Sequence, residues 1–327
     1  MDAISQALRS VRVTGAAFFS AEFKSPWGFD SPPTETVASA LAVDGTERLA
    51  IYHLVTEGTA LVGVKGQPER SLAAGDLVMF PHGHRHTMRN GRPREMHDMA
   101  QILPQLLAEN VRDVRMGGSG SPTRFVCGYF GCDRHATRLF LSGLPPMITI
   151  SIRDGTQANW LENSLLYAMT ELARGRPGYA AVLAKLSEAL FVEALSRYMH
   201  LMPPDSTGWL AAVRDPLVGG ALAALHNEPS HPWTVAELAR QVGGSRSVLA
   251  KRFMHLLGEP PMKYLAAWRL QLGARLLQTT GTKINQIAAE VGYESQAAFN
   301  RAFKREFGLP PDKFRRARPR LTMLEAI

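Results

Sequence analysis

The chain has 327 residues, of which 45% are hydrophobic and 20% are charged, and this composition is typical of a globular protein large enough for two domains. No apolar run reaches the roughly 20 residues of a membrane-spanning helix, and the N-terminal segment lacks the basic and apolar parts of a secretion signal. Two Cys residues exclude a disulfide scaffold. We therefore expect a cytoplasmic protein that does not bind membranes.

The formal net charge of +8 is concentrated in the last third of the chain. Residues 214–327 hold 17 Lys and Arg against 9 Asp and Glu, whereas basic and acidic residues balance in the remainder of the chain. This asymmetry is typical of a domain that binds a phosphate backbone, attached to a neutral domain.

Residues 1–155 alternate short runs of β-branched, aromatic and apolar residues with Gly and Pro turns, which is the pattern of β-strands. The expected strands are Val11–Val13, Ala16–Phe19, Leu49–Val55, Ala60–Val64, Leu77–Phe80, Arg124–Cys127 and Met147–Ile150. Many short strands with this punctuation favour a sandwich or a jelly-roll barrel.

The stretch Gly75–Asn90 contains Gly, five residues, Pro-x-Gly, two residues, His, three residues and Asn. This pattern resembles the second motif of the cupins, and the residues from Gly45 to Gly63 resemble a degraded first motif. The resemblance implies a small β-barrel with an internal pocket. Metal cupins carry His-x-His in the first motif, whereas Ile51 stands at the first of these positions here. The usual cupin metal set of three His and one Glu is therefore incomplete.

Six of the ten His residues and both Cys residues lie between residues 53 and 135. In an extended segment, alternation would place the imidazoles of residues 82, 84 and 86 on one side. His and Cys together suit Zn²⁺, which favours four tetrahedral N and S ligands. We predict that the cofactor is zinc and that an effector pocket lies beside its ligands. The zinc set is His82, His86, Cys127 and Cys132, with His53 or His84 as substitute ligands, and the effector pocket contains His53 and His84.

Two other interpretations of these residues remain open. Cys127 and Cys132 also fit a thiol switch that senses oxidants or electrophiles, helped by nearby protonated His that lowers a thiol pKa. Alternatively, His53 and Cys127 are ordinary interior residues of the barrel, and the other His residues are solvated. The spacing of the two Cys residues would direct them to opposite faces of a strand, which argues against their sharing a zinc ion.

Residues 156–208 are expected to form a helical connector. The spacing of apolar residues predicts helices at Trp160–Ala173 and Tyr179–His200, and the second carries a wide apolar stripe that favours a core or dimer face. The linker Met202–Gly208 then leads to a C-terminal domain over residues 209–320.

The segment Leu217–Arg320 contains one pattern twice. Val235–Gly243 and Ile284–Gly292 carry apolar residues, Ala and Gly at matching offsets, and each is followed by a Ser suited to cap a second helix. Each copy therefore predicts a helix-turn-helix. Between them, Pro261–Gln278 predicts an amphipathic helix roughly 27 Å long. A helix of this length can hold two readers in adjacent major grooves, which lie about 34 Å apart.

The second helix of each copy carries polar side chains of the kinds that contact bases and phosphates in a major groove. The predicted DNA-binding residues are Ser245, Arg246, Ser247, Lys251 and Arg252 in the first copy, and Ser295, Gln296, Asn300, Arg301 and Lys304 in the second.

Trp233–Ala239 and Gly292–Pro311 resemble the signature of the AraC/XylS transcription regulators, and the second match is the closer one. The resemblance implies a seven-helix DNA-binding domain that reads two major-groove segments. It also implies a homodimer, because in this family a helix at the place of Tyr179–His200 commonly pairs two subunits. The expected fold class is α+β. It comprises a cupin-like β-barrel sensor over residues 1–155, a helical connector and dimerisation region over residues 156–208, and an all-α domain with two helix-turn-helix units over residues 209–320.

We therefore expect a sequence-specific transcription regulator, an activator rather than an enzyme, whose cupin-like domain senses a small molecule, a metal or a redox signal. Its expected partners are double-stranded promoter DNA, a second copy of the chain, RNA polymerase and an effector. The alternative is a cupin-type metalloenzyme fused to a DNA-binding domain, which requires an intact metal set. A third class, a nucleoid protein without sequence preference, does not explain why the polar faces of the two copies differ.

Overall fold

The computed structural model describes residues 13–15, 19–37, 47–108, 113–133, 140–141, 143–153 and 159–316. They form two compact units. The β unit contains the described residues of 13–133 together with 144–201, and the helical unit contains 140–141, Gly143 and 202–316. Among the sequence predictions, residues 11–12 and 16–18 of two strands, and also Gly45, lie outside the described residues.

The larger sheet of the β unit has seven strands in the order β10-β2-β11-β4-β7-β12, with β1 paired to β11. Every pair in this sheet is antiparallel except β10 with β2. The strands are β1 (Val13–Gly15), β2 (Phe19–Lys24), β4 (Glu47–Glu57), β7 (Asp76–Phe80), β10 (Asp113–Gly117), β11 (Pro122–Asp133) and β12 (Ile148–Ser151).

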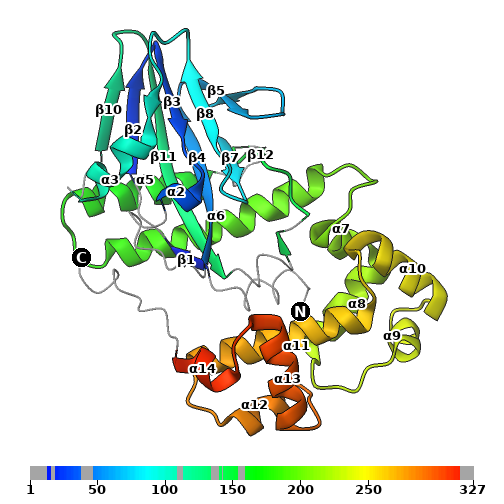
Figure 1. Cartoon of the computed structure of the whole chain (residues 1–327). Helices are drawn as coiled ribbons and strands as arrows, with labels where there is room; N and C mark the ends of the chain where they lie inside the picture. The colour runs from blue at the N-terminus through cyan, green and yellow to red at the C-terminus, as the bar shows by residue number, and fades with distance from the viewer. Residues whose placement is uncertain are drawn as a thin grey trace. The chain divides into compact units, whose positions relative to one another are not determined.

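The smaller sheet has five strands in the order β6-β5-β8-β3-β9. They are β3 (Trp27–Ser31), β5 (Thr59–Val64), β6 (Arg70–Ala73), β8 (His86–Asn90) and β9 (His97–Asp98). Burial alternates along β5, as expected of a strand with one face on a core. Aromatic residues from both sheets, among them Phe29, Phe80 and Phe125, form one core cluster. The two sheets therefore pack as a sandwich (Figure 1).

The structure corrects the predicted barrel. The expected strands around residues 49–55, 60–64, 77–80, 124–127 and 147–150 are confirmed. However, neither sheet is closed among the described residues, because β10 and β12 end the larger sheet and β6 and β9 end the smaller one. A barrel needs a continuous ring of paired strands. Here the strands form two separate sheets, so the β unit is an open sandwich. The chain as described contains this sandwich and helices, which is an α+β fold.

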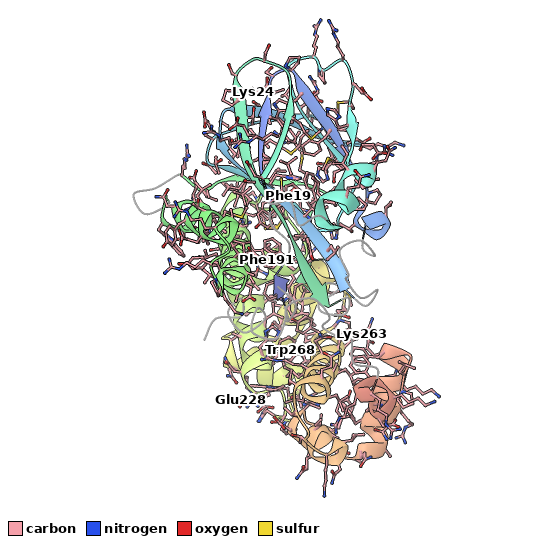
Figure 2. The ribbon with its side chains drawn as sticks, turned by 90° about the vertical axis from the view of Figure 1, so that its left-hand side faces the viewer. Phe19, Lys24, Phe191, Glu228, Lys263 and Trp268 are labelled. Atoms are coloured by element: carbon pink, nitrogen blue, oxygen red, sulfur yellow. The ribbon has the colours of Figure 1, made fainter. Side chains whose placement is uncertain are left out.

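Helices complete the β unit. The short helices are α2 (Thr34–Val37) and α3 (Met99–Ala108), and the long ones are α5 (Asn159–Ala173) and α6 (Tyr179–Leu201), which match the predicted pair. Helix α6 packs on the larger sheet, since the rings of Phe191 and Phe130 lie 5.0 Å apart and Ser187 Oγ lies 3.3 Å from Tyr52 Oη. Phe191 is buried and is labelled in Figure 2. No helix among the described residues is long and apolar enough to cross a membrane.

The helical unit consists of eight described helices. They are α7 (Trp209–Arg214), α8 (Pro216–Asn227), α9 (Val235–Gln241), α10 (Arg246–Leu257), α11 (Pro261–Thr279), α12 (Ile284–Glu290), α13 (Gln296–Phe307) and α14 (Pro311–Arg316). Helix α11 lies between the pair α9–α10 and the pair α12–α13 in the chain, as the sequence predicted.

One aromatic cluster forms around the buried Trp268 of α11, which is labelled in Figure 2. Its ring stacks on that of His226 with centroids 4.0 Å apart, and Tyr264 Oη lies 2.8 Å from His226 Nε2. The indole N–H of Trp209 donates to Tyr264 Oη over 3.0 Å. Phe140 packs edge-on against Trp209 at 4.8 Å, which joins residues 140–141 to this unit.

Candidate functional sites

The helix pairs α9–α10 and α12–α13 have the same local geometry. The second helix of each pair begins at a Ser whose side chain accepts a backbone N–H: Ser245 Oγ from Val248 at 3.3 Å, and Ser295 Oγ from Ala298 at 3.2 Å. The turn before each cap contains a glycine with positive φ, 71° at Gly243 and 86° at Gly292, a conformation that other residues rarely adopt. The repeated sequence pattern thus produces a repeated structure.

The predicted DNA-binding residues lie on the outer faces of α10 and α13. Arg246, Ser247 and Lys251 on α10 are exposed, and so are Gln296, Arg301 and Lys304 on α13. Since Leu249 and Phe253, and likewise Phe299 and Phe303, are fully buried, each helix turns its apolar stripe inward and its polar face to solvent. Ser245 and Ser295 are also exposed, but their hydroxyl groups are engaged as caps.

Two predicted DNA-binding residues have other surroundings. Arg252 forms an ion pair with Asp215, with Nη2 and Oδ2 2.5 Å apart. The carboxylate of Asp215 also caps α8 by accepting from the backbone N–H of Leu217 and Val218. Arg252 therefore ties α10 to the start of α8. Asn300 is half-buried, and its Oδ1 is buried with no hydrogen-bond partner among the described residues.

The predicted DNA-binding set does not contain every exposed residue of these helices. Arg305 follows Arg301 by four residues on α13, so the two guanidinium groups share a face. Val248 and Met254 are apolar residues of α10 that are 48% and 46% exposed. The spacing of Arg305 was a signal available in the sequence. The exposure of the two apolar residues could not be predicted from the sequence, because apolar residues on an amphipathic helix are expected to face inward.

A second candidate site lies inside the β unit. His53 on β4 and Cys127 on β11 are directly paired in the antiparallel register of the larger sheet, and His86 begins β8 in the smaller sheet. His53 Nδ1 lies 2.8 Å from Cys127 Sγ, and His53 Nε2 lies 2.9 Å from His86 Nε2. All three side chains are buried. We call them the Cys–His–His array. It links the two sheets through the core.

The hydrogen bonds of this array have one consistent direction when both imidazoles are neutral. His86 Nδ1 lies 3.0 Å from the backbone carbonyl of His84, which can only accept, so this nitrogen carries the proton. His86 Nε2 then accepts from His53 Nε2–H, and His53 Nδ1 accepts from the thiol of Cys127. The carbonyl at one end therefore determines the tautomer of both rings.

Burial keeps every member of the array neutral. It lowers the pKa of His86 to about 4 and lowers the pKa of His53 well below its usual value, with a further contribution from His86. It also raises the pKa of the Cys127 thiol. These directions follow because the charged form of each group would lose its hydration in an apolar core.

The rings of His82 and His84, from the predicted zinc set and effector pocket, lie edge-to-face with centroids 5.5 Å apart, outside the Cys–His–His array. His82 is half-buried, and its Nε2 lies 3.0 Å from the carbonyl of Leu144, whereas His84 is exposed. Residues 81–85 form a loop between β7 and β8, with Gly83 at a φ of 64°. Strand alternation therefore does not apply to them, and the buried ring of His86 does not share the exposed setting of His84.

The predicted zinc set stays a prediction, because the side chain of Cys132 lies outside the described residues. Within the part of the chain that the structure describes, no group of three or more His, Cys, Asp or Glu residues is arranged to hold a metal ion. His53, which the sequence assigned to an effector pocket and offered as a substitute zinc ligand, is the residue in contact with Cys127. No local signal could have joined these two residues, since they are 74 positions apart in the chain.

Comparisons with known proteins cover both units. A family profile described as cupin matches residues 2–200, and one described as a helix-turn-helix domain matches residues 238–317. The chain is 29% identical over 317 residues to the HTH-type transcriptional regulator AlkR of Acinetobacter baylyi, covering 96% of this chain and 99% of the relative. It is 32% identical over 271 residues to an AraC-like transcription regulator of Streptomyces lividans, covering 82% and 87%.

Among solved structures, a transcriptional regulator with an AraC-type DNA-binding domain from Chromobacterium violaceum is 30% identical to this chain. The match covers 32% of this chain and 94% of that one, with a TM-score of 0.31.

Proposed function

The chain belongs to the AraC-like transcription regulators with an N-terminal cupin domain, and from this premise we propose a separate function for each of its two units. The helical unit binds promoter DNA through two helix-turn-helix readers, α9–α10 and α12–α13. The β unit senses a signal. The chain acts as a homodimeric activator in the cytoplasm, with RNA polymerase as a further partner.

The observation that carries this proposal is the repeated geometry of the two helix pairs. Each has a positive-φ glycine in its turn, a Ser cap and a polar exposed face on its second helix. Helix α11 has 19 residues, which at ~1.5 Å per residue is about 28 Å. That length is close to the roughly 34 Å between successive major-groove faces on one side of DNA.

The side chains on the two readers suit two kinds of contact. Arg246 and Arg301 lie in the first halves of α10 and α13. Their guanidinium groups have the donor geometry that reads guanine. Lys251 and Lys304, one turn further along, suit phosphate contacts that position the reader without carrying sequence information. Arg305 extends the basic face of α13.

Exposed apolar side chains on α5 and α6 support the proposed homodimer. Trp160 and Tyr167 on α5 and Leu201 on α6 are 59%, 56% and 66% exposed, and large apolar side chains exposed in this way suit an interaction surface. Zinc remains the proposed metal for the set His82, His86, Cys127 and Cys132.

The metalloenzyme alternative is not favoured, because the relatives that match most of this chain are named transcription regulators.

The test begins with operators selected by the full-length protein from random duplex DNA, followed by hydroxyl-radical footprinting. Two readers per chain predict two protected segments per monomer, about one helical turn apart. The selected sequence should bind at least 10³-fold more tightly than a scrambled duplex at the same salt concentration. A specificity ratio near one would reduce the protein to a general DNA binder. Protection of a single segment per monomer would refute the second reader.

A further inference from the structure

Val248 is an apolar residue on a helix face that is otherwise polar. It lies in the first turn of α10 and is 48% exposed. Arg246 and Ser247, which precede it, and Lys251, three residues further along, are exposed and polar. Residues three apart are neighbours on the surface of a helix, so the face assigned to DNA includes an apolar group. Val is also a weaker helix former than Ala, Leu or Lys, and helix propensity therefore does not account for its presence here.

The position of this side chain is determined by its own backbone. The N–H of Val248 donates to Ser245 Oγ over 3.3 Å at the N-terminal cap of α10. A β-branched side chain on a helix adopts mainly one rotamer, so its two methyl groups keep a defined position. A contact made by these methyl groups therefore costs little side-chain entropy. Val248 is in this sense preorganised to contact a rigid partner.

Helix α10 is itself held against the start of α8. Gly244 lies in the turn before α10, and a Cβ atom added to it would lie 2.5 Å from Leu217 Cδ1. One turn beyond Val248, the guanidinium group of Arg252 pairs with the carboxylate of Asp215, the residue that caps α8. The first turns of α10 are thus presented on a packed support, which recognition of a defined atom requires.

We propose that Val248 reads the 5-methyl group of a thymine in the half-site bound by α10. This contact deepens the proposed function and rests on it. The N-terminal residues of a reader helix are the ones that contact base edges in the major groove, and Val248 is the third residue of α10. The apolar group displayed on base edges in that groove is the thymine methyl, and apolar side chains contact it.

The distance between Val248 and Arg246 places this thymine beside the guanine assigned to Arg246. The two residues are two positions apart, which at ~1.5 Å per residue is about 3 Å along the helix axis. This is close to the ~3.4 Å between successive base pairs. The thymine is therefore expected within about two base pairs of the guanine.

Two comparisons within the helical unit single out Val248. Met254 on the same helix is 46% exposed, but it lies in the last turn, and its more flexible side chain loses more entropy on contact. The residue of α13 that matches Val248 is Ala298, whose N–H donates to the corresponding cap, Ser295. Ala298 is half-buried and has only a Cβ methyl group. Dependence on a thymine methyl is thus expected in the half-site of α10 and not in that of α13.

The test uses the operator selected by the full-length protein. Deoxyuridine replaces the thymine nearest to the guanine whose preference is lost in Arg246→Ala. This change removes the methyl group and keeps every hydrogen-bonding group of the base pair. Burial of one methyl group is worth a factor of about four in affinity, so the unaltered chain should bind the deoxyuridine operator about fourfold more weakly. Val248→Ala should lose a similar factor on the thymine operator, and deoxyuridine should then cause no further loss, since both changes remove one contact.

Two outcomes would overturn the proposal. In the first, deoxyuridine weakens binding by Val248→Ala as strongly as binding by the unaltered chain, so that another residue makes the contact. In the second, the selected half-site of α10 contains no thymine within about two base pairs of the guanine. Misfolding does not obscure the result, because Val248→Ala replaces an exposed side chain with a better helix former.

A matched variant and a second DNA position serve as controls. Val192→Ala removes the same atoms from a 40% exposed valine of α6, which lies in the β unit. Its response to deoxyuridine should equal that of the unaltered chain, and a response abolished in this variant too would contradict the assignment to Val248. Deoxyuridine in the half-site of α13 should affect the unaltered chain and Val248→Ala equally.

The same titrations distinguish failure of the methyl contact from failure of the proposed function. A specificity ratio near one for the unaltered chain would refute sequence-specific DNA binding, and the methyl contact with it. Specific binding with two protected segments, but with independent effects of Val248→Ala and deoxyuridine, would refute the methyl contact alone. The two readers of the proposed function would then stand.

Discussion

Arg252 on α10 and Asp215 at the start of α8 form an ion pair with a closest N–O distance of 2.5 Å. The Asp215 carboxylate is nearly buried, with 9% of the side chain exposed, and it also caps α8. Arg252 therefore holds α10 against the start of α8. The sequence assigned it to DNA because its residue type and helix position suit a phosphate contact.

We expect Arg252→Ala and Lys251→Ala to have different consequences. Removing Arg252 leaves a nearly buried carboxylate without its partner and should lower the free energy of unfolding by about 1 kcal/mol. Removing the exposed Lys251 should leave stability unchanged, weaken binding to all sequences and reduce the salt slope by about 1. Urea denaturation and binding titrations at several salt concentrations measure both. Equal stability losses in the two variants would contradict this assignment.

Base preference should depend on one Arg in each reader. Arg246→Ala and Arg301→Ala should each relax the preference at one or two positions of the operator, in opposite halves of the site, at a cost of about 1–3 kcal/mol for the preferred base. Arg275→Ala is the matched control, since it removes the same charge from an exposed position of α11. Operator selections repeated with each variant report the change. Relaxation in the same half-site by both variants would argue against separate readers.

The two caps allow a test of the repeated geometry. Ser245→Ala and Ser295→Ala each remove the acceptor for a backbone N–H at the start of a reader helix. Each change should destabilise the helical unit by about 1 kcal/mol, whereas replacement by Asp, which retains an acceptor, should be nearly neutral. Thermal and urea denaturation compare the four variants. If alanine is tolerated at one position only, the two caps are not equivalent.

Phe140 tests a contact that no sequence pattern suggested. Its ring packs on Trp209 and lies 5.9 Å from Trp268, and the residue is 6% exposed. Phe140→Ala should therefore lower the free energy of unfolding of the helical unit by about 3 kcal/mol, through lost burial and the cavity left behind. Phe140→Leu should restore most of it. Three of the five Trp residues lie in the helical unit, so intrinsic fluorescence during urea denaturation of each variant measures the loss.

The predictions from sequence succeeded where the signal was local. The repeat, the Ser caps and the glycine turns of the helical unit involve residues a few positions apart, so their spacing alone implies the geometry. The strands of the β unit were also found, but their order was not, because hydrogen bonding between distant strands leaves no mark in a local pattern. For the same reason the zinc prediction grouped His82 with His86 from their spacing, whereas the structure places His86 beside His53.

Acid should destabilise the protein through the buried histidines. The pKa of His86 is about 4 in the folded chain, and that of an exposed His is about 6.5. Between these values the unfolded chain binds a proton that the folded chain does not, so stability falls as the pH decreases from about 6.5 towards 4. The slope is at most about 1.4 kcal/mol per pH unit for each such group, and His53, whose pKa is also lowered by burial, acts in the same direction.

Urea denaturation at pH 7, 6 and 5 measures this dependence, and the comparison between variants isolates its source. His86→Gln should flatten the dependence relative to the unaltered chain, because the unfolded state then has one proton fewer to gain. His255→Gln, at an exposed position on α10, should leave it unchanged. Carboxylates contribute to acid unfolding in all three proteins alike, so the difference between the slopes reports His86. Identical slopes for the three proteins would mean that His86 is not held neutral in the folded core.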